Sequence, residues 1–227
     1  MDTVIITGAS RGIGRYCADQ LHTFGYRVIG VARQCDARTA FEIRTADVSD
    51  YESLSAAFHD IRRDRSVYAL INAAGIASMN LLLTTPWQTI ERIVETNLLG
   101  TIYASQLIAP ALIRRGIGRI INFSTIAVAI GLKGESVYVA SKAGVEGFSR
   151  SFAREMAPYG VTVNVIAPGP VDTDLIAKVP LEKIQAVVDR QVISRKAGPE
   201  DVLRTVRMLM AADSDMLSGQ VFHIGGV

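Results

Sequence analysis

Short apolar runs alternate along this chain with longer segments in which apolar positions recur at every third or fourth residue. The short runs are rich in valine and isoleucine, as buried strands are, and the longer segments have the period of an amphipathic helix. This alternation favours a parallel sheet covered by helices on both faces, so we expect an α/β fold of about seven strands. The clearest strand candidates are residues 3–7, 26–32, 68–74, 118–124, 161–167 and 220–224.

The connection after the second strand is unusually short. The first connection, by contrast, contains residues 13–24, whose apolar positions form a single helical stripe. If the second strand ends near Val31 and the third spans roughly residues 41–45, too few residues remain for a crossover helix, which needs about a dozen or more. We therefore predict that the helix between strands 2 and 3 is missing or rudimentary.

Length and charge narrow the class of protein. With 227 residues, 49% of them hydrophobic, the chain can bury one large core, and we expect a single domain over residues 1–227. The formal net charge of +2 includes no long basic run, so no nucleic-acid partner is expected. The N-terminus has an aspartate at position 2 and only a short apolar run after it, unlike a signal peptide or a membrane span.

Cysteine and histidine usage points to neither a disulfide framework nor a metal site. The two cysteines, Cys17 and Cys35, are too few for a disulfide scaffold and lack metal-ligand spacing. His22, His59 and His223 are scattered along the chain. We therefore expect a cytoplasmic protein without a bound metal and without a membrane partner.

A glycine-rich turn, TGASRGIG at residues 7–14, follows the first strand directly. Glycine permits a tight turn and close backbone approach, and a helix beginning there offers unpaired N–H groups and a partial positive charge to a pyrophosphate. Glycines also serve ordinary turns, so this motif alone indicates rather than proves a dinucleotide site. The candidate contacts are Gly8, Ser10, Arg11, Gly12, Ile13 and Gly14.

The spacing of this turn resembles that of the short-chain dehydrogenase/reductases, and further motifs of that family follow in order. They are Asp47-Val48, NAAG at 72–75, Asn97, YVASK at 138–142 and PGPVDT at 168–173. The resemblance covers essentially the whole chain. It implies a Rossmann-type doubly wound sheet and an NAD(P)-dependent oxidoreductase. Stretches such as GRIINFS and VTVNVIAPG are similar to those of 3-oxoacyl-[acyl-carrier-protein] reductases.

The resemblance also assigns cofactor contacts. It implies that Asp47 binds the adenine edge, Asn72 stabilises the central strand beside the cofactor, and Thr173 contacts the nicotinamide carboxamide. Their plainer interpretations are a helix cap, a satisfied buried amide and a turn residue. The other implied positions are Val48, Ala73, Ala74, Gly75, Pro168, Gly169 and Val171, where Ala73 replaces a common asparagine of the family.

Tyr138 and Lys142 are the candidate catalytic pair. Hydride transfer to a ketone places negative charge on its oxygen, which needs a proton donor, and Tyr138 can supply the proton. A free phenol has a pKa of about 10, and Lys142, one helical turn away, can favour the phenolate. The resemblance implies that Lys142 also binds the nicotinamide ribose and that Asn97 holds a water of a proton relay. Without the other motifs, Tyr138 and Lys142 would be interpreted as two solvent-exposed residues on one face of a helix.

The third catalytic position departs from the family pattern. A serine typically stands about thirteen residues before the tyrosine, where this chain has Thr125, preceded by Ser124. Neighbouring strand residues point to opposite faces, so the two hydroxyls are not expected to address the substrate together. We choose Thr125, which supplies the same donor and acceptor as serine, and keep Ser124 as the substitute.

Arginines near the second strand favour NADP over NAD. An acidic residue at the end of that strand binds the ribose 2'-hydroxyl of NAD, whereas a basic one suits the 2'-phosphate of NADP. Arg33 stands there and Arg11 lies in the glycine-rich turn, so both guanidinium groups can converge on one phosphate. Asp36 argues instead for NAD, because the short connection can bring its carboxylate to the ribose.

The sequence leaves the substrate and the assembly open. By resemblance, residues 174–198 form a substrate lid, and the substrate is a small carbonyl compound such as a 3-oxoacyl thioester, free or on a carrier protein. The alternatives are an NAD-dependent alcohol dehydrogenase working oxidatively and a non-catalytic dinucleotide-binding protein. Small residues on the Tyr138 helix predict a homodimer or homotetramer. They are Ala140, Gly144, Gly147 and Ser151.

Overall fold

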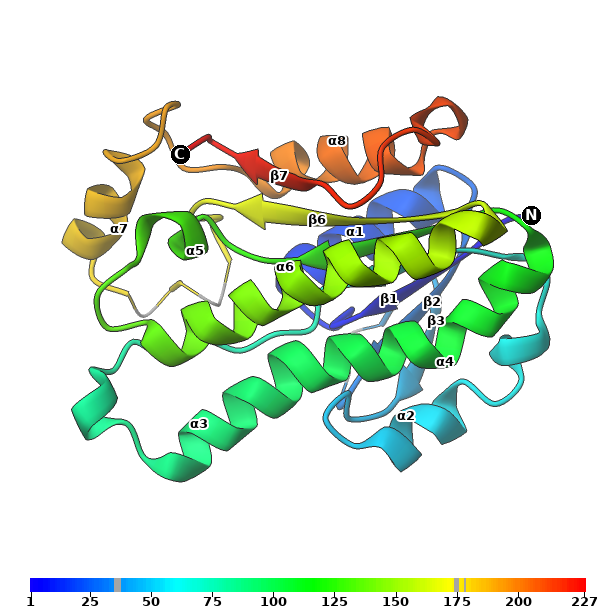
Figure 1. The fold of residues 1–227 in the computed structure, drawn as a ribbon, viewed down its shortest axis with the longest axis horizontal. Coiled ribbons are helices and arrows are strands. Elements are labelled where there is room, and N and C mark those ends of the chain that lie inside the picture. Colours follow the sequence, from blue (N-terminus) through cyan, green and yellow to red (C-terminus); the bar gives the residue numbers. More distant parts are fainter. Residues whose placement is uncertain (35–37, 174–175, 178) are drawn as a thin grey trace.

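The centre of the molecule is one seven-stranded parallel sheet (Figure 1). The computed structural model describes residues 1–34, 38–173, 176–177 and 179–227. The strand order is β3-β2-β1-β4-β5-β6-β7, and every neighbouring pair is parallel. This confirms the predicted doubly wound α/β fold. The strands are β1 Thr3–Thr7, β2 Arg27–Ala32, β3 Glu42–Thr45, β4 Val67–Asn72, β5 Gly118–Phe123, β6 Val161–Pro168 and β7 Val221–Ile224.

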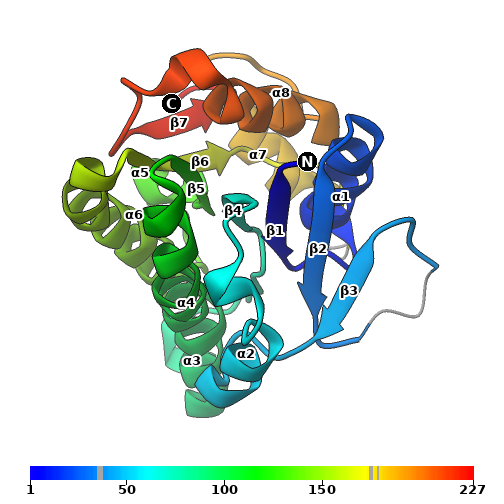
Figure 2. The same ribbon diagram turned by 90° about the vertical axis from the view of Figure 1, so that its right-hand side faces the viewer.

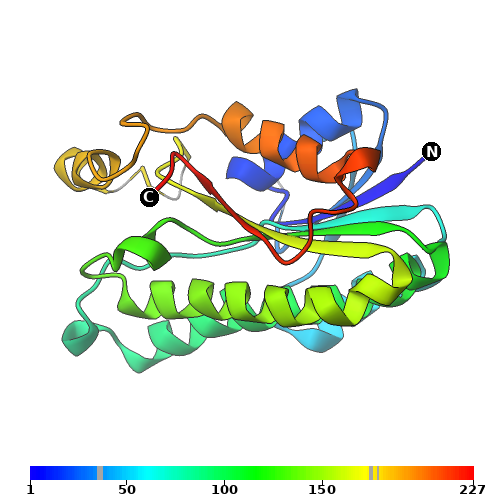
Figure 3. The ribbon, with the colours of Figure 1, turned by 45° about the horizontal axis from the view of Figure 1, so that its top comes forward.

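Helices cover both faces of the sheet (Figure 3). On one face lie α1 and α8, and on the other lie α2, α4 and α6. Side chains of one strand alternate between the two layers, so Val4 and Ile6 pack into the first core and Ile5 into the second. The helices are α1 Gly12–Thr23, α2 Tyr51–Ala57, α3 Trp87–Val94, α4 Gly100–Arg115, α5 Ala127–Ile130, α6 Ser136–Met156, α7 Leu181–Val188 and α8 Pro199–Met210.

The connection from β2 to β3 contains no helix in its described residues, 33–34 and 38–41. The predicted loss of a crossover helix is confirmed for those residues, and Figure 2 shows β3 at the open edge of the sheet. Gly30 in β2 leaves room for the turn after β1, because a Cβ there would lie 2.7 Å from the Cβ of Ala9. Cys35 and Asp36 lie outside the described residues.

A π-helical turn, Glu95–Leu99, joins α3 to α4. The combined stretch Trp87–Arg115 is long and apolar enough to span a membrane, and 56% of its most apolar window is buried inside the fold, as for a core helix. A single π turn within an α-helix is uncommon and often marks a functional position. The π turn of this chain contains Asn97, which is fully buried.

Candidate active site

A cavity of about 410 Å³ opens where the carboxyl ends of the strands meet the loops and α7. This volume falls in the usual range for small-molecule sites, and the place is where open parallel sheets bind ligands. Most of its lining is apolar, and its charged members are Glu135, Lys142 and Lys183. The predicted site residues that line it are Ile13, Ala73, Gly75, Ser124, Thr125, Tyr138, Lys142, Pro168, Gly169, Val171 and Thr173.

The glycine-rich turn lies beside this cavity and fits a dinucleotide. Gly8 has φ +73°, and a Cβ on it would lie 2.7 Å from the Ala74 nitrogen, so only glycine is accommodated. A Cβ on Gly14 would collide with the Gly8 carbonyl. Helix α1 begins at Gly12 with no acidic residue in its first turn and no side-chain cap, so its first N–H groups are left for an anion.

The turn also reaches the nicotinamide end of the predicted site. A Cβ at Gly12 would lie 3.7 Å from the Thr173 Cβ, which places the two motifs side by side. The backbone N–H of Ala74 donates to the Thr7 hydroxyl at 3.3 Å, joining the ends of β1 and β4. Ser10 lies in the same turn, between β1 and α1. The cofactor motifs that are distant in sequence are thus brought together.

Strand geometry separates the two candidate hydroxyls. The Thr125 hydroxyl lies near enough to the Tyr138 phenol to lower the pKa of Tyr138, and Thr125 Oγ1 accepts from the Ala127 N–H at 3.2 Å. Ser124 donates instead to Glu146 Oε1 on α6, at 2.7 Å. Thr125 is therefore the hydroxyl on the side of Tyr138, while Ser124 is engaged in a buried contact.

The charges around Tyr138 differ from the expected pattern. Burial raises the pKa of Tyr138 well above its ordinary value, the Glu135 charge raises that pKa further, and only the Thr125 hydrogen bond lowers it. The Lys142 ammonium donates to the Phe123 carbonyl at 2.9 Å, and burial lowers the pKa of Lys142 to about 8. Both side chains line one cavity, but Lys142 does not lower the pKa of Tyr138 in this arrangement, contrary to the expectation, and burial dominates.

Asn97 ties three elements together. Its Nδ2 donates to the Ile76 carbonyl at 2.9 Å and its Oδ1 accepts from the Ile76 N–H at 2.8 Å. The same Nδ2 reaches the Ser141 hydroxyl at 3.1 Å, and Ser141 donates to the Tyr138 carbonyl at 2.7 Å. The π turn is thereby locked to the loop after β4 and to α6.

Other predicted cofactor residues have structural partners in addition to any ligand. Buried Asn72 donates to Asn122 Oδ1 at 2.8 Å and to the Ser105 hydroxyl at 3.2 Å, which matches its plainer interpretation. Asp47 accepts from the Ser49 hydroxyl at 2.7 Å, so it stabilises a turn. It does not cap α2, because Asp50 has that role. Val48 is buried in the second core.

The two arginines proposed for NADP are exposed. Arg33 Nη1 lies 4.0 Å from an Asp47 carboxylate oxygen, and more than half of the Arg33 side chain is accessible. Arg11 is the residue before α1 and is also exposed. Among the residues that the structure describes, no cluster of acidic, histidine or cysteine side chains could hold a metal ion.

Comparison with known proteins settles the family. The profile of the family described as short chain dehydrogenase matches residues 2–183. The chain belongs to this family. It is similar to the 3-oxoacyl-[acyl-carrier-protein] reductases FabG of Haemophilus influenzae, at 32% identity over 98% of this chain and 96% of the relative, and of Staphylococcus aureus, at 33% over 99% and 96%. This short-chain dehydrogenase is therefore an NAD(P)-dependent oxidoreductase.

A solved structure shows the same fold. The ligand-free aldohexose dehydrogenase of Thermoplasma acidophilum is 28% identical to this short-chain dehydrogenase, with a TM-score of 0.90 over 99% of this chain and 93% of that one. Sequence reasoning missed two features of the site, the buried Glu135 in the cavity and the contact from Ser141 to Asn97. A glutamate and a serine next to a motif carry no signal of their own until the fold places them.

Proposed function

We propose that this short-chain dehydrogenase is an NADPH-dependent reductase of a ketone, such as a 3-oxoacyl thioester or a similar carbonyl compound. The observation that carries the proposal is that Thr125, Tyr138 and Lys142 line one cavity, with the Thr125 hydroxyl on the side of Tyr138. A proton donor and a second hydroxyl aimed at one point are what a developing alkoxide needs.

Each residue of the site has a distinct role in the proposed reaction. The bound nicotinamide supplies the hydride. Tyr138 donates its phenolic proton to the ketone oxygen, and Thr125 donates a hydrogen bond to the same oxygen. Lys142, which lines the same cavity, would supply positive charge that favours the resulting phenolate and would hold the nicotinamide ribose. Asn97 holds the π turn against α6, the helix that carries Tyr138 and Lys142.

The preference for NADPH rests on Arg11 and Arg33. Arg11 lies in the turn that fits the pyrophosphate and Arg33 follows β2, and both side chains are exposed. Among the described residues, Arg33 makes one weak ion pair, 4.0 Å from Asp47, which a phosphate can displace. Asp36, the residue that would favour NAD, lies outside the described residues. The named FabG relatives are carbonyl reductases, which supports the reductive direction.

The test is steady-state oxidation of NADPH and of NADH by the purified protein with a panel of 3-oxoacyl thioesters and simple diketones. Tyr138→Phe should lower kcat by roughly 10²- to 10⁴-fold while NADPH still binds, because only the proton donor is removed. Tyr159→Phe, a change at an exposed tyrosine of the short 3-10 helix Ala157–Tyr159 that follows α6, is the matched control. Equal turnover of wild type and Tyr138→Phe would contradict the mechanism.

A second candidate is an NAD-dependent dehydrogenase that oxidises an alcohol. The similarity to the aldohexose dehydrogenase favours it. In the same assay, sugars with NAD as oxidant would then be turned over and ketones with NADPH would not. Tight binding of either cofactor without turnover of any substrate would favour the non-catalytic alternative.

A further inference from the structure

Glu135 is a buried carboxyl group inside the substrate cavity. It stands directly before α6, three residues ahead of Tyr138, and only 6% of its surface is exposed. Its side chain lines the same cavity as Thr125, Tyr138 and Lys142. Its charge raises the pKa of Tyr138, which lines the same cavity.

No described residue of the chain satisfies this carboxylate. The backbone of Glu135 is engaged, since its N–H donates to Leu132 and its carbonyl accepts from Val139. No side-chain hydrogen bond or ion pair reaches its carboxyl oxygens from the residues described, and burial alone raises the pKa of Glu135. The carboxyl oxygens are not sealed off from the cavity, so a molecule there can reach them, and buried polar groups in native proteins usually have a hydrogen-bond partner.

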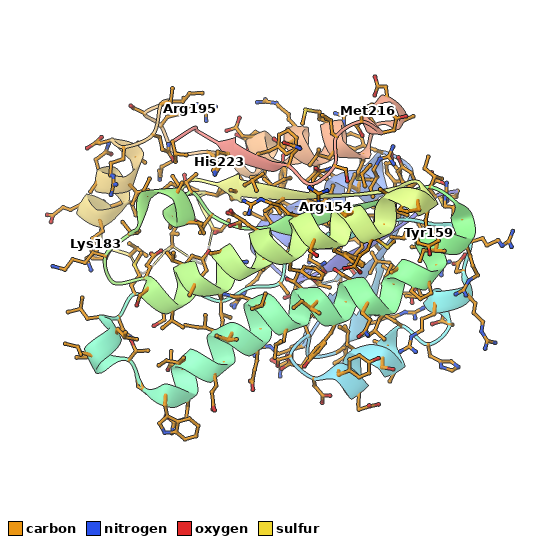
Figure 4. The ribbon with its side chains drawn as sticks, viewed as in Figure 1. Arg154, Tyr159, Lys183, Arg195, Met216 and His223 are labelled. Carbon is orange, nitrogen blue, oxygen red and sulfur yellow. The ribbon has the colours of Figure 1, made fainter. Side chains whose placement is uncertain are left out.

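The cations of the cavity are engaged or lie at its rim. The Lys142 ammonium donates to the Phe123 carbonyl. Lys183 lies on α7, at the outer end of the molecule, and its side chain is exposed (Figure 4). The other walls near Glu135 are apolar, including Ile126, Ala127 and Leu132. Among the described residues nothing donates to this carboxylate, so its donor is solvent or a ligand in the cavity.

We propose that Glu135 is a specificity-determining residue that accepts a hydrogen bond from a hydroxyl group of the substrate, close to the carbonyl that is reduced. The proposal rests on the proposed function and narrows it to hydroxyketones. A carboxylate can only accept hydrogen bonds, so it disfavours substrates that present a carboxylate or a thioester oxygen at that place. A site built for a donor also rejects the analogue that lacks one.

The test compares matched substrates in wild type, Glu135→Gln and Glu135→Leu. The substrates are a short hydroxyketone, its O-methyl ether and the ketone without the oxygen, each with NADPH. In wild type, kcat/KM for the hydroxyketone should exceed that for the ether by roughly tenfold or more, as for a hydrogen bond to a charged group. Glu135→Leu should reduce this ratio to about one, and Glu135→Gln should give an intermediate value.

The controls separate this proposal from the proposed function. Turnover of the unsubstituted ketone reports the reductase itself, and Glu155→Gln, at an exposed glutamate of α6, should leave the ratio unchanged. Melting temperatures in the presence of NADP report binding of the hydroxyketone and the ether without turnover. If neither binding nor kcat/KM distinguishes the two in wild type, or if Glu135→Leu keeps the wild-type ratio, the proposal is wrong, whether or not ketones are reduced.

Discussion

At the scale of single residues, two adjacent hydroxyls have different roles because strand geometry turns them apart. Ser124 donates to Glu146 in the core, and Thr125 meets Tyr138 in the cavity. The rule that neighbouring side chains on an extended strand point to opposite faces predicts the separation, but not which face holds the cavity. The structure supplies the second part, because α6 brings both Glu146 and Tyr138 to this strand end.

We expect Thr125→Val, which keeps the shape and removes the hydroxyl, to lower kcat by roughly 10²-fold, the usual effect of losing one donor to an oxyanion. Thr125→Ser should restore activity. Ser124→Ala should instead lower the free energy of unfolding by about 1–3 kcal/mol, because Glu146 loses a buried partner. Kinetics and urea unfolding of the three variants check this, and the opposite assignment would exchange the two effects.

Lys142 should make stability depend on pH. Its pKa falls from 10.5 to about 8 on folding, so between these values the unfolded chain binds more protons than the native one. The free energy of unfolding therefore rises as the pH rises through this window. Relative to Lys142→Met, wild type should gain on the order of 3 kcal/mol between pH 7 and pH 10.5. A difference that stays constant in urea unfolding across this range would contradict the buried ammonium.

At the scale of elements, the junction of β1 and α1 is the part of the site that the sequence predicts best. The glycines, their spacing and the helix beginning all follow from local rules. The π turn at Asn97 could not be predicted in this way, because an extra residue in a helix turn leaves no periodic signal in so short a segment. The place of Glu135 in the cavity could not be predicted from the sequence either, since α5 and α7, which help to enclose it, are separate elements of the chain.

The close approach at Gly14 can be tested directly. A methyl group there would collide with the Gly8 carbonyl, so Gly14→Ala should destabilise the fold by about 1–3 kcal/mol and weaken NADPH binding. Gly147→Ala is the control, because nothing lies within 4 Å of a Cβ there and alanine is the better helix former. Calorimetry and cofactor titration would disprove the contact if Gly14→Ala behaved like the control.

At the scale of the whole molecule, α4 and α6 lie side by side on the outer face of the sheet (Figure 1). Of the small residues predicted for an interface on α6, Ala140, Gly147 and Ser151 are exposed, while Gly144 packs against Leu98. The parallel α/β architecture followed from the pattern of strands and helices, and its doubly wound arrangement from the family resemblance. The assembly did not, since one chain's sequence shows only that close approach is sterically allowed.

We propose that a second copy of the chain packs on this face of α6. Gly147→Arg should then dissociate the oligomer, because the arginine side chain would occupy the space of a helix of the second copy. The single chain has room for this side chain, since nothing lies within 4 Å of a Cβ at Gly147. Light scattering coupled to size exclusion measures the outcome, with Gly147→Ala retaining the wild-type mass. An unchanged mass for Gly147→Arg would place the interface elsewhere.

The all-parallel order of the described strands has a consequence for how the chain folds. Thr3 pairs with both Arg27 and Val67, so the central strand cannot find its second neighbour until a long intervening segment has been arranged. No hairpin can form first as a local nucleus, because parallel neighbours require crossovers. Sheets of this kind fold slowly and expose strand edges on the way, so the yield of native protein is set by a kinetic competition with aggregation as well as by final stability.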